Sequence, residues 1–259
     1  MNQSINRSRT VCKIISNRPL VDQVFEIILA CPEIVKKVRP GQFINLYCRH
    51  SGRLLPRPIS VCEVDLRNGH LHLIYAILGK GTEEFSGYKA GETMEIMGPF
   101  GNGFNLDSSD GNYLIIGGGV GTPPMVELCK QLKGKKTIVA GFRDNPYLVD
   151  RLKQYGDVYI TTDNGSAGFK GHVVEFIEQR GLKGTIYACG PAPMLQGIQA
   201  YAKKHGLQAY LSLEERMGCG FGACVGCVTK VVADTDTGWR YKKVCKDGPV
   251  FDAGEVLFP

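Results

Sequence analysis

Three cysteines stand within nine positions of the stretch MGCGFGACVGCVTK, residues 217–230, of this 259-residue chain. With Cys245 they form the pattern Cys219-x4-Cys224-x2-Cys227-x17-Cys245, a spacing typical of plant-type [2Fe–2S] ligation. The glycines at positions 218, 220, 222 and 226 let a backbone curl around a cluster and point its N–H groups at the sulfurs. A zinc site with four cysteine ligands is the alternative, but zinc ribbons usually present two C-x2-C pairs and this chain has one. The pattern favours an iron–sulfur cluster.

The remaining cysteines show no such grouping. Cys12, Cys31, Cys48, Cys62 and Cys129 are scattered through strand and helix patterns, so we interpret them as small buried apolar side chains.

Composition indicates an ordinary globular protein, with 43% hydrophobic and 22% charged residues, long enough for two or three domains. The net charge of +6 is spread along the chain, which makes nucleic acid an unexpected partner. No apolar run approaches the ~18 residues of a membrane helix, and the N-terminal stretch MNQSINRSRT has no signal-peptide pattern. We expect a cytoplasmic protein with reduced thiols.

The pattern of strands, helices and turns divides the chain into three regions. Residues 1–101 alternate short apolar strands with Gly, Pro and Asn turns, which predicts an antiparallel β-barrel; within it His70 and His72 are expected on one face of a half-buried strand, without a function. Residues 102–215 alternate apolar strands with helices, which predicts an α/β domain with a parallel, doubly wound sheet. Its helices include one from Pro123 and one over residues 146–155. Residues 216–259 carry too few apolar side chains for a core of their own.

Two further stretches have the chemistry of nucleotide sites. In RPIS, Arg57 offers a guanidinium fork for a phosphate and Ser60 a hydroxyl for a ring edge, while Gly79, Gly81 and Thr82 could form a backbone nest for a pyrophosphate. LIIGGGVGTPPM, residues 114–125, is a glycine-rich turn between a strand and a helix, with Thr122 as expected N-cap. The turn does not match G-x-G-x-x-G, and each stretch alone is a weak signal.

In this order, the RPIS strand, the glycine turn and the CGP of YACGPAPM (187–194) resemble the ferredoxin reductase family, in which a barrel holds FAD and a second domain binds a nicotinamide nucleotide. The segments RMGCGFGACVGCV and YKKVCKDGPVFDAGEV further resemble the electron transfer subunits of type B dihydroorotate dehydrogenase. The resemblance covers nearly the whole chain and implies an FAD barrel over 1–101, an NAD-binding domain over 102–215 and a [2Fe–2S] domain over 216–259.

The resemblance also implies site residues. For FAD they are Arg57, Pro58, Ile59, Ser60, Ile74, Tyr75, Ala76, Gly81 and Thr82; for the cluster they are Cys219, Cys224, Cys227 and Cys245. Such subunits often have Arg where Ala76 stands, so Arg57 would have to hold more of the FAD phosphates.

The nucleotide site is assigned more weakly. Candidates are Gly117, Gly118, Gly119, Gly121, Thr122, Asp163, Cys189, Gly190 and Pro191. Asp163 could meet a ribose hydroxyl, and Cys189 is either near the nicotinamide or a buried strand-end thiol. The resemblance implies NAD rather than NADP, although Arg143 could approach a 2′-phosphate.

The function implied by the resemblance is electron transfer from dihydroorotate, through the FMN of a catalytic partner subunit, the [2Fe–2S] cluster and FAD, to NAD+ in pyrimidine (UMP) biosynthesis. The implied complex is a heterotetramer with two subunits of each kind, and no acid–base residue of this chain is needed because the cofactors carry the chemistry. One alternative is the reductase subunit of a bifurcating ferredoxin-NADP oxidoreductase or of a soluble hydrogenase. Another is a non-enzymatic interaction module held by zinc.

Overall fold

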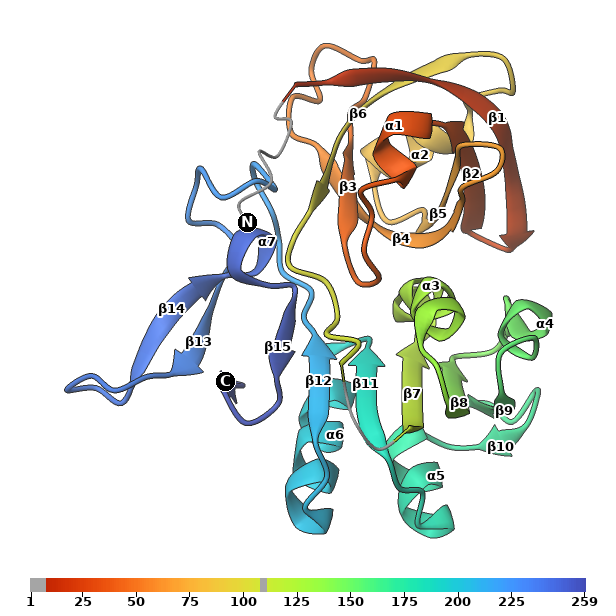
Figure 1. Cartoon of the computed structure of the whole chain (residues 1–259). Helices are drawn as coiled ribbons and strands as arrows, with labels where there is room; N and C mark the ends of the chain where they lie inside the picture. The colour runs from red at the N-terminus through yellow and green to blue at the C-terminus, as the bar shows by residue number, and fades with distance from the viewer. Residues whose placement is uncertain (1–7, 108–110) are drawn as a thin grey trace.

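The computed structural model describes residues 8–107 and 111–259 and arranges them around three β-sheets (Figure 1). The interpretation of the N-terminal stretch rests largely on residues 1–7, which lie outside the described residues. Across the described residues no helix has both the length and the apolar character that a membrane crossing requires.

The first sheet is a closed antiparallel barrel with strand order β1-β2-β5-β4-β3-β6. Its strands are β1 (Thr10–Val21), β2 (Val24–Ala30), β3 (Phe43–Leu46), β4 (Arg57–Asp65), β5 (His70–Ala76) and β6 (Thr93–Phe100). In β5, Leu71 and Leu73 are fully buried while His70 and His72 are only partly buried, because alternate side chains of a strand point to opposite faces. The barrel predicted from the sequence is confirmed.

Two short helices, α1 (Pro32–Val35) and α2 (Lys80–Ser86), accompany the barrel. Phe85 of α2 is buried in the barrel core, edge-on to Tyr75 with ring centroids 6.0 Å apart. The helix therefore fixes the loop that follows β5.

The second sheet has seven strands in the order β10-β9-β8-β7-β11-β12-β15, and all neighbours are parallel except β12 and β15. The strands are β7 (Asn112–Gly118), β8 (Lys135–Phe142), β9 (Asp157–Thr162), β10 (Phe169–Lys170), β11 (Thr185–Cys189), β12 (Ala209–Ser212) and β15 (Val250–Asp252). The helices are η1 (Gly119–Gly121), α3 (Pro123–Gln131), α4 (Val149–Leu152), α5 (Val173–Arg180) and α6 (Ala192–His205). Residues of α3 and α4 share one core cluster and residues of α5 and α6 another, as expected of a doubly wound sheet.

Of two helices predicted from the sequence, the first is confirmed and the second is shorter than predicted. Helix α3 buries Met125, Leu128 and Cys129 as its pattern predicts. Helix α4 covers only Val149–Leu152 rather than residues 146–155, because Leu148 adopts a left-handed backbone with φ 63° immediately before it.

Thr122 stands at the predicted N-cap position of α3 but does not cap the helix with its side chain. Its backbone is already helical and its hydroxyl makes no capping bond, because the turn η1 runs directly into α3. The hydroxyl is buried with no hydrogen-bond partner among the described residues.

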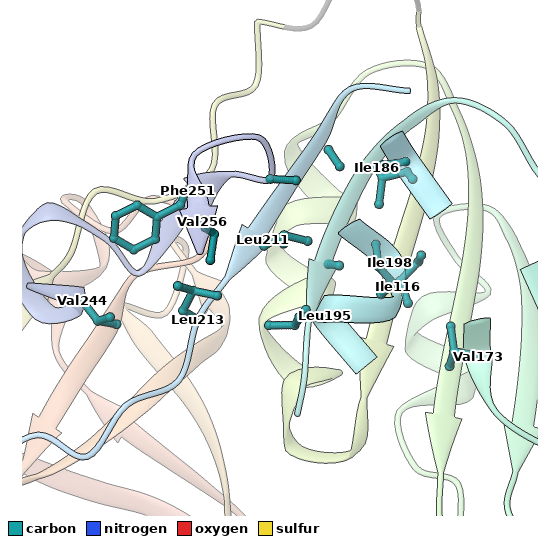
Figure 2. Packing of buried hydrophobic residues seen from close by; sticks show 14 of the residues in the cluster. Ile116, Val173, Ile186, Leu195, Ile198, Leu211, Leu213, Val244, Phe251 and Val256 are labelled. Carbon is teal, nitrogen blue, oxygen red and sulfur yellow. The ribbon is translucent and has the colours of Figure 1, made fainter. Parts of the chain in front are cut away.

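The C-terminal segment forms a three-stranded antiparallel sheet of β13 (Val228–Val232), β14 (Trp239–Lys243) and β16 (Val256–Leu257), with a short helix α7 (Val244–Asp247). It lacks a separate core: Val244, Phe251 and Val256 pack in one cluster with Leu211 and Leu213 of the parallel-sheet region (Figure 2). Strand β15 leaves this segment and extends the seven-stranded sheet beside β12. The sharing explains how a segment with few apolar residues keeps a defined shape.

Candidate functional site

A cleft of about 600 Å³ lies between the barrel and the carboxyl end of the parallel sheet. The nine residues predicted to contact FAD all line it: Arg57, Pro58, Ile59, Ser60, Ile74, Tyr75, Ala76, Gly81 and Thr82. The opposite wall comes from Val120, Gly121, Cys189, Gly190 and the segment Ser212–Met217. The cleft therefore joins barrel, parallel sheet and the chain that enters the cysteine loop.

Strand order explains why residues distant in sequence share this cleft. Strands β4 and β5 are antiparallel neighbours with Val61 opposite Leu73, so the start of β4 lies beside the end of β5. The chain then turns through Gly79 into α2, which brings Gly81 to the same edge of the barrel.

Arg57 is the main cation of the barrel wall. Its guanidinium lies directly over Gly81, where a Cβ atom would stand 2.0 Å from Nε. Its Nη1 donates to the carbonyl of Leu55 at 2.5 Å, and within residues 8–107 and 111–259 it has no carboxylate partner in an ion pair. The charge is therefore held in place and available to an anionic ligand, as a phosphate requires.

The hydroxyl of Thr82 makes hydrogen bonds within the turn and is not free to bind a ligand in the cleft. Its Oγ1 accepts from the backbone N–H groups of Leu78 at 2.9 Å and Gly79 at 3.3 Å, and it donates to the Gly79 carbonyl at 3.1 Å. These bonds fix the loop between β5 and α2, so the residue shapes the cleft through its backbone.

A second cavity of about 510 Å³ lies at the carboxyl end of β7, β8 and β9. Of the predicted nucleotide residues, Gly118, Gly119, Asp163 and Pro191 line it. Gly121, Cys189 and Gly190 line the first cleft instead, while Gly117 and Thr122 are lining residues of neither. The predicted set is thus divided between two neighbouring cavities.

The glycine turn separates the two cavities and is shaped by close backbone contacts. A Cβ at Gly121 would stand 2.3 Å from the carbonyl oxygen of Cys189, and one at Gly117 would stand 2.7 Å from Cα of Thr122. Tyr147 donates its hydroxyl hydrogen to the Gly119 carbonyl at 2.8 Å. Only glycine fits these two positions against the protein's own backbone, and the turn that they form borders both cavities.

Polar groups gather at one side of the second cavity. Nδ1 of His172 lies 3.3 Å from Oδ1 of Asp163, and Arg143 lines the same cavity. Phe142, Val173, Val174, Pro193 and Met194 supply an apolar wall. An apolar wall with a few polar groups suits a nucleotide base and its ribose.

Cys189 ends β11 at the edge of the first cleft. Burial raises the pKa of its thiol to about 12, a hydrogen bond with Ser212 opposes this effect, and the charge of Glu214 adds to it. The raised pKa favours the neutral thiol, which is a weaker nucleophile than the thiolate.

The four predicted ligand cysteines lie as two pairs. Cys219 and Cys224 are neighbours, and Sγ of Cys219 accepts the backbone N–H of Cys224 at 3.4 Å. The side chains of Cys227 and Cys245 also interact, and the charge of Cys219 acts on Cys245 as well, so the two pairs lie close to each other. In the described part of the chain, no three His, Cys, Asp or Glu side chains form a compact single-ion site.

The pKa is shifted in opposite directions at Cys219 of the first pair and at Cys245 of the second. Burial raises the pKa of Cys219, but backbone N–H groups of Cys224, Phe221 and Ala223 outweigh burial and lower its pKa to about 6. Burial and the neighbouring Cys227 raise the pKa of Cys245 to about 12. The loop thus stabilises a thiolate at Cys219 with its own peptide groups, as glycine-rich metal loops do.

Two asparagines of the barrel region hold the cysteine segments. Asn45 of β3 donates from Nδ2 to the carbonyl of Cys219 at 3.0 Å. Asn102 donates to the Val250 carbonyl at 2.7 Å and accepts the Val250 N–H at 3.1 Å. These contacts place the cysteine loop beside the strand that lines the first cleft.

A charged cluster fixes the parallel sheet against the barrel. Glu26 of β2 is fully buried and pairs with Arg151 of α4 at 2.6 Å, with Arg18 at 3.1 Å and with Nδ1 of His72 at 3.2 Å. Burial raises its pKa, but the hydrogen bonds from His72, Arg151 and Arg18 outweigh burial and lower it to about 2. The ionised carboxylate therefore anchors α4 to the barrel.

Sequence reasoning missed several of these groups. Lys80, Glu214, Glu215 and Arg216 line the first cleft and His172 the second. Asn45 had one available signal, since it is the polar residue inside the apolar stretch FINLY. Charged residues at a turn or linker carry no comparable pattern.

Comparison with known proteins agrees with this architecture. Residues 214–257 match the family described as the iron–sulfur cluster binding domain of dihydroorotate dehydrogenase B. The dihydroorotate dehydrogenase B (NAD+) electron transfer subunit of Streptococcus pneumoniae serotype 4 is 42% identical over 253 residues, covering 95% of this chain and 99% of the relative. That of Caldanaerobacter subterraneus subsp. tengcongensis is 40% identical over 254 residues, covering 97% and 100%.

Solved structures give the same fold. An NADH-dependent reduced ferredoxin-NADP oxidoreductase superposes with a TM-score of 0.86 at 28% identity, covering 99% of this chain and 91% of that one. The cytochrome b5 reductase domain of Ulva prolifera nitrate reductase shares the fold at a TM-score of 0.64 and 17% identity, covering 78% and 95%. The predicted ferredoxin reductase-like fold is confirmed, and by its near full-length relatives the chain belongs to the family of dihydroorotate dehydrogenase B (NAD+) electron transfer subunits.

Proposed function

We propose that this chain is the NAD-linked electron transfer subunit of a dihydroorotate dehydrogenase complex in pyrimidine (UMP) biosynthesis. When bound, the [2Fe–2S] cluster and FAD supply the redox chemistry that carries electrons from the FMN of a catalytic subunit to NAD+. The observation that carries the proposal is the continuity of the three sites: Ser212–Met217 lines the first cleft and leads directly into the cysteine loop. The glycine turn connects the same cleft to the second cavity.

The first cleft is proposed as the FAD site. All nine predicted residues line it, and Arg57 supplies a cation without a carboxylate partner in the described residues. Lys80 adds a second cation at the cleft. These charges compensate for the absence of an arginine at Ala76, and the chain's own role is to bind the phosphates and orient the flavin ring.

The second cavity is proposed as the NAD site. Gly118 and Gly119 bring backbone to one side of it, and Asp163 presents a carboxylate at another. A carboxylate accepts hydrogen bonds from ribose hydroxyls and repels a 2′-phosphate, which favours NAD. Arg143 lines the same cavity and acts in the opposite sense, so the proposed preference for NAD over NADP rests on the family as well as on Asp163. Gly121, Cys189 and Gly190 line the flavin side of the same turn, where a nicotinamide ring must arrive.

The four cysteines are proposed as the cluster ligands. Side-chain interactions join Cys219 with Cys224 and Cys227 with Cys245, and the charge of Cys219 also acts on Cys245, so all four thiols would be available to one cluster. A structural zinc site usually presents two C-x2-C pairs, and this chain has one. The peptide N–H groups at Cys219 would stabilise the anionic ligand and tune the cluster potential.

The division into residues 1–101, 102–215 and 216–259 is likewise proposed as a division by cofactor, although β15 crosses it by pairing with β12. A partner subunit is implied by the family. We infer that this partner carries FMN, that the complex contains two subunits of each kind and that it works in the cytoplasm.

A second candidate is the reductase subunit of a bifurcating ferredoxin-NADP oxidoreductase. The observation in its favour is the TM-score of 0.86 over 99% of this chain at 28% identity. The identities of 40–42% to dihydroorotate dehydrogenase B subunits favour the first candidate.

The deciding experiment is anaerobic purification of the tagged chain with its native partners. We expect a visible spectrum of flavin plus iron–sulfur cluster, about two irons per chain, FAD and FMN in the complex, and dihydroorotate-dependent reduction of NAD+. A colourless zinc protein would refute the cofactor assignment. A large flavin or iron–sulfur partner without dihydroorotate oxidation would favour the second candidate.

A further inference from the structure

Asn45 is a fully buried polar residue at the junction of the barrel and the cysteine loop. It lies in β3 between the buried residues Ile44 and Leu46. Burying an amide side chain is unfavourable unless its groups are hydrogen-bonded. Its Nδ2 makes such a bond outside the barrel, to the carbonyl of Cys219 at 3.0 Å.

The other half of this amide also faces the cysteine loop. A Cβ at Gly220 would stand 2.4 Å from Oδ1 and 2.5 Å from Nδ2 of Asn45. Gly220 has φ +73°, a conformation that favours glycine. Oδ1 has no hydrogen-bond partner among the described residues, so the one hydrogen bond that this side chain makes in the described part of the chain goes to the cysteine loop.

Strand pairing connects Asn45 to the proposed flavin site. Its partner in β4 is Pro58, which lines the first cleft. Phe43, two residues earlier in β3, lines the same cleft. One pair of neighbouring strands therefore carries both part of the proposed flavin wall and the contact to Cys219.

We propose that Asn45 is a positioning residue for electron transfer: it holds the Cys219 carbonyl, and so the first ligand of the cluster, at a fixed place relative to the flavin strand. This inference rests on the proposed function, since it requires FAD in the cleft and a cluster on the cysteines. Hydrogen bonds around metal ligands orient them and tune the metal, and their loss commonly costs 10- to 100-fold in affinity or activity. Asn45 acts on the backbone of the ligand residue rather than on its sulfur.

The test compares Asn45→Leu, which removes the amide at similar volume, with Gln199→Leu. Gln199 of α6 also binds the C-terminal segment by its amide, donating to the carbonyls of Ala253 at 2.5 Å and Val256 at 2.8 Å. It does so from the parallel-sheet side, away from the ligand residues. The complex is purified anaerobically, and its iron and FAD contents and the electron paramagnetic resonance spectrum of the reduced cluster are recorded.

The kinetic readout separates two electron routes. NADH-to-dye activity reports the flavin alone, while freeze-quench resonance after mixing with NADH reports reduction of the cluster. We expect Asn45→Leu to keep dye activity within about twofold, to slow cluster reduction by on the order of 10-fold or more, and to shift the resonance spectrum. Gln199→Leu should match the wild type in both rates and in the spectrum.

Each outcome decides the proposal. An Asn45→Leu complex with iron, cluster-reduction rate and spectrum like the wild type overturns it, and so does an equal slowing in Gln199→Leu. If Asn45→Leu loses iron, the smaller Asn45→Ser is measured instead, and a wild-type rate and spectrum in that variant overturn the proposal. A wild-type complex with no cluster signal refutes the proposed function itself, which is a separate result.

Discussion

Replacing Arg57 by alanine removes the main cation of the proposed FAD site. A hydrogen bond between charged groups contributes about 1.5–3 kcal/mol, and each 1.4 kcal/mol corresponds to a tenfold change in binding. Because Arg57 has no carboxylate partner among the described residues and points over Gly81, its loss leaves no buried anion unpaired. We therefore expect FAD affinity to fall roughly 10- to 150-fold in a folded barrel.

The assay measures FAD release on dilution, followed by the rise of free-flavin fluorescence, together with the FAD-to-protein ratio after purification. Arg67→Ala is the matched control, because Arg67 is exposed in the turn at the opposite end of β4 and its loss changes net charge equally. Gly81→Ala should also lower FAD affinity, since the added Cβ would stand 2.0 Å from Nε of Arg57 and displace the guanidinium.

The reasoning is refuted if Arg57→Ala retains full, tightly held FAD, or if Arg67→Ala loses as much. Loss of flavin in Arg57→Ala together with an unfolded circular dichroism spectrum would also contradict it, because a partly exposed residue at the cleft should not be needed for folding.

Three further predictions concern the cluster, the charged anchor and nucleotide choice. Cys224→Ser, in an assembled complex, should keep NADH-to-dye activity while dihydroorotate-dependent reduction of NAD+ collapses; full coupling without the cluster would contradict the relay. Because the pKa of Glu26 is lowered from 4.5 to about 2, its ionised form stabilises the fold above about pH 4.5 and the effect is lost as pH falls toward 2. The full contribution to the free energy of unfolding is roughly 3 kcal/mol. Glu26→Gln should therefore lower the unfolding temperature more at pH 6 than at pH 3, and an equal decrease at both pH values would contradict this prediction. The wild type should have a higher kcat/KM for NADH than for NADPH, and Asp163→Ser should reduce that ratio ~10-fold; an unchanged ratio would show that Asp163 does not select the nucleotide.

The sequence predicted groups that act through local spacing. The cysteine pattern, the RPIS strand and the face of α3 each occupy one short stretch, so periodicity and spacing suffice to find them. The residues proposed for FAD line one cleft because antiparallel neighbours bring the start of β4 beside the end of β5.

Groups that act across the fold were missed, or were grouped without the division that the fold imposes. The carbonyl that Asn45 binds lies 174 positions away in sequence, and no local pattern encodes such a pair. The predicted nucleotide residues were treated as one set, but the glycine turn borders two cavities and divides them. Thr122 stands at the predicted N-cap position but makes no capping bond, because a 3-10 turn places it already inside helical geometry.

Strand β15 has a consequence for how the edge of the sheet is protected. It pairs with the side of β12 that faces away from β11, so the segment that carries the four cysteines also covers this edge. An open edge of unpaired peptide groups recruits other chains into aggregates. A change in the cysteine segment that released β15 would expose that edge, so integrity of the cysteine segment and protection against aggregation are linked in this protein.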